Sequence, residues 1–423
     1  MKLHWQILIA LVLAVVAGLA TGVEGSLLGL RFYDVYTFIG TLFLNGLKMI
    51  IVPLVVSSII VGIAGIGSSR AFGRLGGRTL IYYLATTFIS VSIGLLVVNT
   101  LTPGIHEGQP LKDVINLTAD VSAIADKVEG RGAGDLIDVF LRMVPPNVVA
   151  AAANGQMLGL IFFSLLFGFF VARVGEPHAE NLYGFWAGIY EVMLQITLFI
   201  MRFAPIGVFG LVAVVMADTG ASGFLDLMEV LGLFFFSVLL ALALHFLVVM
   251  PLILHFVAGV NPVRHYRAMA PALLTAFSTA SSSATLPLTI ECVEKNAGVS
   301  NRTSSFVLPL GSTVNMDGTA LYECVAAMFI AQAYGLDLSL TQQFVIVLLA
   351  LLTSIGVAGV PSASLVAITI ILGYIGLPLE GIALIYVVDR LLDMCRTAVN
   401  VFSDSCGAVV IGRLEGEEGI LKN

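Results

Sequence analysis

The sequence contains few charged residues. Its 423 residues include 20 Lys and Arg and 27 Asp and Glu, or 11% of the chain, whereas an ordinary soluble domain carries about 25%. Apolar residues make up 58%, and the mean hydropathy is +1.02. Because so few charges cannot cover the surface of a water-soluble fold of this length, the composition predicts a polytopic membrane protein.

Other absences argue against further classes of protein. The net charge is −7 and no basic block occurs, so a nucleic-acid partner is not expected. No GxxxxGKS or GxxxxGKT loop is present, which argues against an ATP-driven pump. The six histidines are scattered and the four cysteines lack CxxC spacing, so neither a zinc site nor an intramembrane enzyme is predicted; the cysteines are Cys292, Cys324, Cys395 and Cys406.

Apolar segments divide the chain into candidate membrane spans, each of which needs about 20 helical residues. Eight spans are expected, at 3–22, 35–66, 79–103, 145–172, 184–216, 227–260, 302–335 and 378–411. The placement of Lys and Arg puts both termini in the cytoplasm if residues 268–296 and 340–376 each enter and leave on the same side. Arg202 lies inside the fifth predicted span, and snorkelling of its charged end toward the membrane surface is the only explanation that the sequence offers. We therefore predict an all-α fold with eight transmembrane helices and two re-entrant helical hairpins.

Small polar residues and proline interrupt both predicted hairpins. The first breaks at Ser278–Ser283 and the second at Gly356–Ser364. Each flanking arm has about a dozen residues, or about 18 Å of helix, which is too short to cross. Non-helical backbone at membrane depth is tolerated where protein buries it or where it lines a wet cavity. Two such breaks favour inverted repeats that meet at a midplane binding site, and two kinked spans are the alternative.

The last span carries a stripe of polar side chains. Offsets of 0, 4, 7, 11 and 15 residues place them within an arc of about 80° on a helix; they are Asp389, Asp393, Arg396, Asn400 and Asp404, with Thr397 at the border. Each ion costs at least about 2.5–3.5 kcal/mol at the bilayer centre, so the stripe is expected to face an internal polar site. Arg396 suits a carboxylate, and the aspartates suit an ammonium or a hard cation. Three acids against one arginine favour cation binding over a self-compensating ion-pair network, which is the alternative.

The seventh span contains Asn315 and Asp317, two residues apart, which a regular helix would point about 200° from each other. Gly318 beside them permits an unwound turn, whose carbonyls would join both side chains as Na⁺ ligands. A simple glycine kink is the alternative. One turn beyond Thr319, a buried Glu323 carboxyl could carry a proton or make a structural hydrogen bond.

The third span places the three hydroxyls of Tyr83, Thr86 and Thr87 on one helical face. By spacing alone, such hydroxyls are more often packing and back-bonding groups than ligands.

Four motifs in this order resemble the glutamate transporter family, the dicarboxylate/amino acid:cation symporters. They are the serines of Ser281–Ser283, NMDGT at Asn315–Thr319, the glycine-proline tip at Gly356–Pro361, and DMCRTAVNVFSD at Asp393–Asp404. The resemblance covers essentially the whole chain, including Leu47–Pro53 in the second span. It implies a homotrimer in the lipid bilayer that carries acidic amino acids together with cations.

The resemblance also implies a static scaffold and a transport domain that moves across the bilayer as an elevator. Residues 1–78 would form scaffold helices 1 and 2, 79–103 transport-domain helix 3, and 104–222 an extracellular loop with scaffold helices 4 and 5. Residues 223–423 would complete the transport domain with helix 6, hairpin 1 (268–296), helix 7, hairpin 2 (340–376) and helix 8.

A set of ligands follows from the same resemblance. Arg396 would bind the side-chain carboxylate of the substrate and Asp393 its ammonium; the pocket would be completed by Ser281, Ser282, Thr319, Thr397, Asn400 and the backbone from Val360 to Ser364. One sodium site would use carbonyls of Gly311, Asn315 and Asn400 with the Asp404 carboxylate. A second would use carbonyls of Thr313, Met316, Ser354, Ile355 and Val357, and a third Tyr83, Thr86, Thr87, Asn315 and Asp317. Glu323 matches the position assigned to proton coupling in animal members.

The chain departs from the family pattern at four positions. Ala280 stands where archaeal members have an arginine and Met394 where animal members have one, so potassium counter-transport is not inherited from either group. Val357 replaces a threonine, but only the backbone carbonyl at this position would bind Na⁺. Ser364 replaces a glycine near the ligand and could change the amino-acid preference.

Together these features predict uptake of aspartate or glutamate driven by Na⁺ across an inner (plasma) membrane. A proton-coupled symporter of the same fold is the nearest alternative, motivated by Glu323. C4-dicarboxylates without an amine are disfavoured, because Asp393 would then be an uncompensated anion beside the ligand. An ion channel is the alternative from another class, since re-entrant loops around a polar cavity also describe pores.

Overall fold

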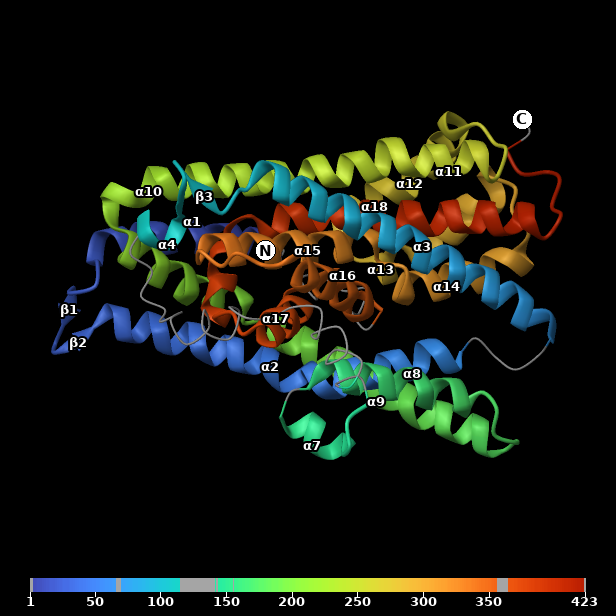
Figure 1. Cartoon of the computed structure of the whole chain (residues 1–423), viewed down its shortest axis with the longest axis horizontal. Helices are drawn as coiled ribbons and strands as arrows, with labels where there is room; N and C mark the ends of the chain where they lie inside the picture. Colours follow the sequence, from blue (N-terminus) through green and yellow to red (C-terminus); the bar gives the residue numbers. More distant parts are fainter. Residues whose placement is uncertain are drawn as a thin grey trace.

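The computed structural model describes residues 3–65, 70–114, 141, 144–154, 156–355 and 364–421, and these form a predominantly helical fold (Figure 1). The strands among them are short. Ser26–Leu27 (β1) pairs antiparallel with Leu30–Arg31 (β2), and Ile105–His106 (β3) with Gln109–Pro110 (β4). Both pairs are turns between helices, so the prediction of a helical fold is confirmed.

The N-terminal part of the chain forms helices of very different lengths. They are α1 (Leu3–Thr21), α2 (Phe32–Ala64), α3 (Arg70–Leu101), the short α4 (Leu111–Val114), α7 (Val148–Ala153), α8 (Met157–Val171) and α9 (His178–Met201). Helix α2 packs against α8 and α9, which lie together along one side of the molecule (Figure 1). Helix α3 leaves this group and packs against the C-terminal helices.

The fifth and sixth predicted spans are divided differently in the structure. The chain leaves the helix at Arg202 and Phe203 and then forms α10, which runs from Ala204 to Leu244 with a sharp break at Gly220 (φ 65°, ψ 179°). A π-helical turn, η1 (His245–Val249), and α11 (Met250–Phe256) continue it. The residues of the predicted span at 184–216 therefore belong to two helices, and Arg202 lies exposed at the C-terminal end of α9.

The first hairpin consists of α12 (Pro262–Thr279), α13 (Ser282–Glu291) and the π-helical η2 (Cys292–Asn296), with α12 packed against the other two. Its first arm has 18 residues, longer than the dozen predicted. The chain reverses at Ala280, which adopts a left-handed conformation (φ 50°, ψ 40°). Its tip therefore lies within the predicted serine-rich segment.

The second hairpin consists of α16 (Leu340–Ser354) and α17 (Ser364–Ile375), which pack against each other. Ser339 and Gln342 form a reciprocal capping box at the start of α16. The predicted break at 356–363 lies outside the described residues. A single 3₁₀ turn, η3 (Leu379–Gly381), then leads into the last helix, α18 (Ile382–Leu414).

The two hairpins begin and end at opposite ends of the molecule. Near the base of the first, Leu421 N donates to Ala297 O, and Arg264 donates to Leu421 O at the C-terminal end of the chain. Near the base of the second, Gln343 accepts a hydrogen bond from Asn99 at the end of α3 that leads to β3. Figure 1 has these two ends far apart along the long axis.

Between the hairpins lie α14 (Asn301–Val314) and α15 (Asp317–Ala333). Nearly all of α15 is buried, because α3, α10, α16, α17 and α18 surround it. A helix that is covered all round needs no polar face, so the polar side chains along α15 require a separate explanation.

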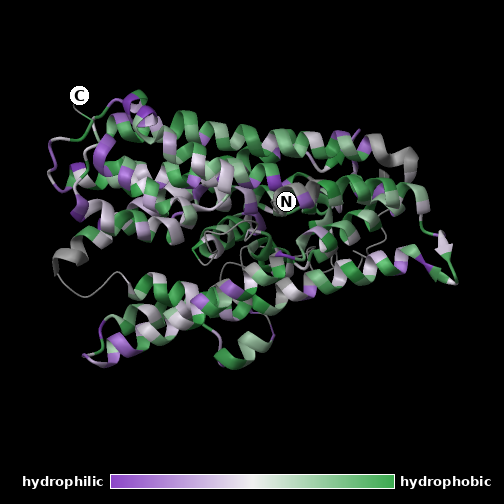
Figure 2. Cartoon of the chain, turned by 180° about the vertical axis from the view of Figure 1, so that it is seen from behind, coloured by the Kyte–Doolittle hydropathy of each residue, from purple (hydrophilic) through white to green (hydrophobic). Residues whose placement is uncertain are grey.

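Two stretches of the described helices are long and apolar enough to span a bilayer by themselves, Leu75–Leu101 and Asp226–Phe256. Six shorter apolar stretches accompany them: Ile9–Thr21, Val52–Ala64, Gly159–Val171, Ala204–Gly220, Leu340–Ser354 and Ser364–Ile375. Apolar residues extend along most helices, and hydrophilic residues gather toward the ends of the molecule (Figure 2). The eight spans and two re-entrant hairpins stay a prediction.

Candidate functional site

An interruption between α14 and α15 positions the central polar residues. Asn315 (φ −101°, ψ 83°) and Met316 (φ −113°, ψ 58°) leave the helical conformation, and Asp317 begins the next helix. The predicted unwound turn is present, but Gly318 is not where the chain unwinds. A Cβ on Gly318 would lie 2.7 Å from the carbonyl oxygen of Arg396, so the glycine allows α18 to approach α15 closely.

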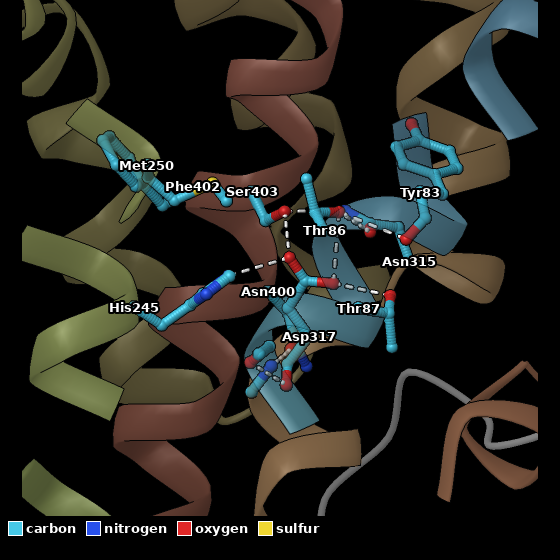
Figure 3. Close-up of polar contacts among 12 residues, drawn as sticks. Tyr83, Thr86, Thr87, His245, Met250, Asn315, Asp317, Asn400, Phe402 and Ser403 are labelled. Atoms are coloured by element: carbon cyan, nitrogen blue, oxygen red, sulfur yellow. Dashed lines mark hydrogen bonds and ion pairs between the residues drawn. The ribbon is translucent and has the colours of Figure 1, made fainter. Parts of the chain in front are cut away.

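The Asp317 carboxylate is fully buried and is surrounded by side chains from three other elements (Figure 3). Thr87 of α3 donates to Oδ1 over 2.6 Å, and Thr86 lies 3.4 Å from the same atom. Ser403 of α18 donates to Oδ2 over 2.6 Å, and His245 Nε2 of η1 lies 3.0 Å from it. The three hydroxyls and the imidazole thus converge on one acid.

A second buried acid, Asp404, lies next to this cluster. Its Oδ1 accepts a 2.9 Å hydrogen bond from Asn315 Nδ2, and Thr86 donates to Asn315 Oδ1 over 3.3 Å. A Cβ on Gly311 would be 2.4 Å from Asp404 Oδ1 and 2.6 Å from the Tyr83 hydroxyl. A side chain at position 311 would therefore require the Asp404 carboxylate and the Tyr83 hydroxyl to move.

The structure therefore brings together some residues of two of the three predicted sodium-ligand sets. Residues of the first set that lie in mutual contact are Gly311, Asn315 and Asp404, and those of the third are Thr86, Thr87, Asn315 and Asp317. The Tyr83 hydroxyl adjoins the first set and donates to Val307 O over 2.7 Å. Two of the three α3 hydroxyls thus contact an acid, and their role as sodium ligands stays a prediction.

The second predicted sodium set is not joined by a hydrogen bond among the residues described. Thr313 donates to Leu310 O and Ser354 to Leu351 O, both within their own helices. Met316 and Ile355 are buried at the ends of α15 and α16. Val357 lies outside the described residues, as does Val360 of the predicted substrate pocket.

Asn400 connects α18 to the start of α15. Its Oδ1 accepts hydrogen bonds from the backbone N–H groups of Gly318 (2.8 Å) and Thr319 (3.3 Å), and its Nδ2 donates to Thr319 Oγ1 over 2.9 Å. A side chain thereby satisfies two N–H groups in the first turn of α15, as a helix cap does. The predicted substrate residues Thr319 and Asn400 hold each other in place.

Arg396 is the centre of the predicted substrate site and is fully buried. Its Nη2 donates to Asp389 over 3.0 Å and to Asp393 over 2.9 Å, and its guanidinium carbon lies 3.7 Å from the centre of the Tyr322 ring. Nε and Nη1 have no hydrogen-bond partner among the described residues. The N–H groups on Nε and Nη1 therefore remain for another acceptor, such as a carboxylate oxygen.

Arg390 lies beside the stripe of three acids and one arginine, and it reduces the predicted negative excess without removing it. Arg396 contacts both Asp389 and Asp393, and Arg390 Nη1 approaches the second oxygen of Asp393 to 3.5 Å. Helical spacing excludes Arg390 from the stripe, because its Cβ lies to one side on the helical wheel. Its long side chain reaches across, which helical spacing alone does not reveal.

The remaining predicted site residues lie at helix ends or along helices. Ser281 caps α13 by accepting from Ala284 N over 3.2 Å, and Ser282 is buried beside it, while α13 packs against α18. Thr397 donates to the backbone oxygen of Asp393 over 2.8 Å. Ser364 is buried at the start of α17 with no partner for Oγ among the described residues.

Glu323 of α15 faces the second hairpin. Thr353 of α16 donates to Glu323 Oε2 over 2.8 Å, whereas Oε1 has no partner in the described part of the chain. Both residues are fully buried. The carboxyl therefore makes the structural hydrogen bond considered above, and its second oxygen can hold a proton.

Sequence reasoning missed His245, Ser403 and Tyr322. His245 is one of the scattered histidines, although a single ionisable residue within the apolar run from Val230 to Val249 is a signal for an internal site. Ser403 lies next to Asp404 and carries no signal of its own. Tyr322 contacts Arg396 through its ring face, and spacing does not predict such a contact.

An apolar helical fold around a buried set of acids, amides and hydroxyls is typical of membrane transport proteins. Comparison with known families then gives the assignment: the chain belongs to the sodium:dicarboxylate symporter family, whose model matches residues 3–414. The family and the relatives below are transporters, and this protein is accordingly a transporter and not an enzyme.

Curated relatives match nearly the whole chain. The proton/glutamate-aspartate symporter of Escherichia coli K12 is 37% identical over 98% of this chain and 93% of its own length. The proton/sodium-glutamate symport protein of Geobacillus stearothermophilus is 36% identical over 98% and 95%. Human excitatory amino acid transporter 3 is 36% identical over 99% of this chain and 87% of its own.

Proposed function

We propose that the protein is a secondary active symporter that takes up aspartate or glutamate together with Na⁺. The observation that carries the proposal is the buried Arg396, whose Nε and Nη1 have no partner among the described residues, while its Nη2 binds two acids. The names of the bacterial and animal relatives, which include glutamate and aspartate, support this substrate class.

The substrate pocket is built around the two ends of an acidic amino acid. Arg396 binds the side-chain carboxylate, and Asp393, four positions after Asp389 on α18, receives the ammonium. Asn400 lies one turn after Arg396 on α18, and its hydrogen bond holds Thr319 of α15 beside it. Thr397, Ser281, Ser282, the 360–364 backbone and Ser364 complete the pocket from α18 and the two hairpin tips.

Na⁺ is transported as a second substrate. The cluster at Asp317 offers a carboxylate together with the hydroxyl and amide oxygens of Thr86, Thr87 and Asn315. Asp404 with the carbonyls of Gly311, Asn315 and Asn400 offers another set. Hard alkali cations prefer such oxygen donors, and a bound cation also compensates acids that are expensive to bury. Carbonyls of Thr313, Met316, Ser354, Ile355 and Val357 form the remaining set.

Coupling follows from the position of Asn315 and Asn400. Each is assigned to a sodium set, and Asn400 also binds the N–H groups of Gly318 and Thr319, which border the substrate pocket. Asn315 lies two residues before Gly318 in the same interrupted segment. Ordering these residues around Na⁺ therefore pre-orders the pocket, which lets the two substrates bind with positive cooperativity.

Movement of a transport domain against a scaffold completes the proposal. The scaffold comprises residues 1–78 and 104–222, and the transport domain 79–103 and 223–423, in a homotrimer with eight spans and two re-entrant hairpins per subunit. Both termini lie on the cytoplasmic side of the inner membrane. In support, α3 packs against α15 and α16, away from the α2, α8 and α9 group.

Variants of Arg396 test the function. Arg396→Ala is expected to weaken aspartate binding at least about 100-fold, because truncating one member of a buried charge pair costs several kcal/mol. Arg396→Lys keeps the charge but not the planar fork, so it also binds weakly. The measurement is isothermal titration of aspartate and glutamate into purified protein in Na⁺.

The control variant is Arg31→Ala, which removes an exposed arginine that pairs with Asp34 outside the site. It is expected to bind like the wild type. Unchanged aspartate affinity in both Arg396 variants would show that the substrate lies elsewhere.

A proton-coupled symporter of the same fold is the second candidate. It is favoured by Glu323, a fully buried carboxyl with one hydroxyl donor from the second hairpin. The Escherichia coli relative is named a proton symporter and the Geobacillus relative a proton/sodium one. The two candidates differ in which gradient drives accumulation of the amino acid.

A further inference from the structure

Arg390 is a charged residue of α18 that no predicted role includes. Its side chain is only 12% exposed, and Nη1 lies 3.5 Å from Asp393 Oδ2. Arg396 Nη2 lies 2.9 Å from the other oxygen, Asp393 Oδ1. The Asp393 carboxylate is therefore bridged between two guanidinium groups in this structure.

This arrangement changes the electrostatics of the substrate site. The two negative charges of Asp389 and Asp393 are balanced by the two positive charges of Arg390 and Arg396. A substrate ammonium that approaches Asp393 meets a carboxylate already engaged at both oxygens. Because Arg396 is also held by Asp389, Arg390 is the partner that can withdraw at lower cost.

The Arg390 contact is also the looser of the two. It is longer by 0.6 Å than the Arg396 contact, and the Arg390 side chain is partly exposed whereas that of Arg396 is 0% exposed. A partly exposed guanidinium loses less than a fully buried one when it leaves its partner, and its long side chain has other rotamers available. Arg390 is therefore the residue that a competing cation displaces.

We propose that Arg390 is a specificity-determining residue: it serves as the counter-ion of Asp393 that the substrate ammonium displaces, and so reduces how much binding depends on the amine. This inference rests on the proposed function. A ligand with an amine gains the Asp393 contact but must release Arg390 from it. A ligand without an amine gains no such contact, but leaves Asp393 compensated by Arg390.

The objection raised above against amine-free dicarboxylates does not hold for this site. That objection required Asp393 to be an uncompensated anion beside the ligand, and the contact with Arg390 provides the compensation. Removal of the Arg390 charge restores the objection. Discrimination between an aminated and an amine-free ligand of equal chain length is therefore the quantity that Arg390 controls.

Competition between aspartate and succinate tests the proposal. The two ligands share a four-carbon dicarboxylate skeleton and differ in the amine. In purified full-length protein at fixed Na⁺ and pH, the dissociation constant of aspartate and the inhibition constant of succinate are measured for the wild type, Arg390→Gln and Arg390→Lys. Succinate is expected to displace aspartate from the wild type.

Arg390→Gln is expected to raise the ratio of the succinate constant to the aspartate constant about tenfold, as loss of one contact to a charged group predicts. Arg390→Lys keeps a cation near Asp393, so its ratio should stay within about threefold of the wild type. Rescue by lysine distinguishes a charge effect from a packing effect. If Arg390→Gln does not fold, Arg390→Met, which keeps the apolar stem, replaces it.

Arg31→Gln is the matched control. It removes the charge from another arginine–aspartate pair at i, i+3, with Asp34, that is exposed and outside the site; its ratio should equal that of the wild type. An unchanged ratio in Arg390→Gln overturns the role of Arg390, as does failure of succinate to displace aspartate from the wild type. Absence of aspartate binding by the wild type overturns the proposed function itself.

Discussion

At the scale of residues, the buried acids differ in the groups that surround them. Asp317 receives hydroxyl hydrogen bonds from Thr87 and Ser403, whereas Asp393 contacts two guanidinium groups. Hydroxyls orient a carboxylate without neutralising it, so Asp317 keeps its attraction for a cation. The guanidiniums balance the charge of Asp393, so this acid is suited to exchange one cationic partner for another.

Substitution of Thr87 tests the role of the hydroxyls. Thr87→Val removes the 2.6 Å hydrogen bond to Asp317 with little change in shape. The Na⁺ concentration for half-maximal aspartate binding is expected to rise about tenfold, because a hydrogen bond to a charged group contributes roughly 1.5–3 kcal/mol. Thr87→Ser, which keeps the hydroxyl, should remain close to the wild type.

Thr100→Val provides the control on the same helix. Thr100 is exposed, and its hydroxyl donates to Leu96 O over 2.7 Å within α3. Its replacement should leave the Na⁺ dependence unchanged. A Na⁺ dependence that is equally unchanged in Thr87→Val would remove Thr87 from the cation site.

At the scale of elements, close contact between α15 and α18 shapes the site. Gly318 faces the backbone of Arg396, and Asn400 of α18 binds the first turn of α15. These contacts fix where Asp317 lies relative to Ser403 and where Thr319 lies relative to Asn400. Small residues at helix contacts allow such close approach in membrane proteins.

Gly318→Ala is expected to destabilise the protein by about 1–3 kcal/mol, because its Cβ would collide with backbone that cannot move alone. Helix propensity by itself predicts the opposite sign, a gain of roughly 0.5–1 kcal/mol for alanine over glycine. Thermal unfolding in detergent measures the difference through the apparent Tm, together with aspartate binding. A raised Tm would contradict the proposed close contact.

Gly373→Ala is the matched comparison. Gly373 lies within α17, and a Cβ added there would meet no atom of a neighbouring element within 4 Å in the described part of the chain. This variant should leave the Tm equal or slightly raised. Equal losses in both variants would indicate a general effect of alanine and not a collision at α18.

The sequence predicted elements best where hydropathy and charge agree. The helices, the break at Asn315–Asp317 and the reversal near Ser281 follow from apolar runs, small polar residues and proline. Interruption of the fifth span at Arg202 was not predicted, because hydropathy averages over a break of two residues inside an apolar run. Short breaks of this kind are visible only in the backbone.

Site residues close in sequence were predicted better than those that meet through packing. The α18 stripe follows from helical spacing, and the family resemblance supplied its roles. His245 and Asp317 are 72 residues apart, and a sequence pattern does not place them 3.0 Å from each other. Arg390 was missed for a different reason: side-chain length, and not Cβ position, determines its contact with Asp393.

At the scale of the whole molecule, hairpins that start at opposite ends surround a shared polar centre. Thr353 of the second hairpin contacts Glu323, and α13 of the first packs against α18. Both hairpins thus reach the elements that carry Arg396 and Asp317. A carrier of this design can close one side of its site before it opens the other, which active transport requires.

Uptake of labelled aspartate by proteoliposomes that contain the purified protein tests the transport proposal most directly. An inward Na⁺ gradient should drive aspartate above its external concentration, and dissipation of that gradient should release it. A pH gradient imposed on sodium-free vesicles should produce no accumulation. Accumulation under the pH gradient alone would establish the proton-coupled alternative, and equilibration without accumulation under both gradients would contradict symport.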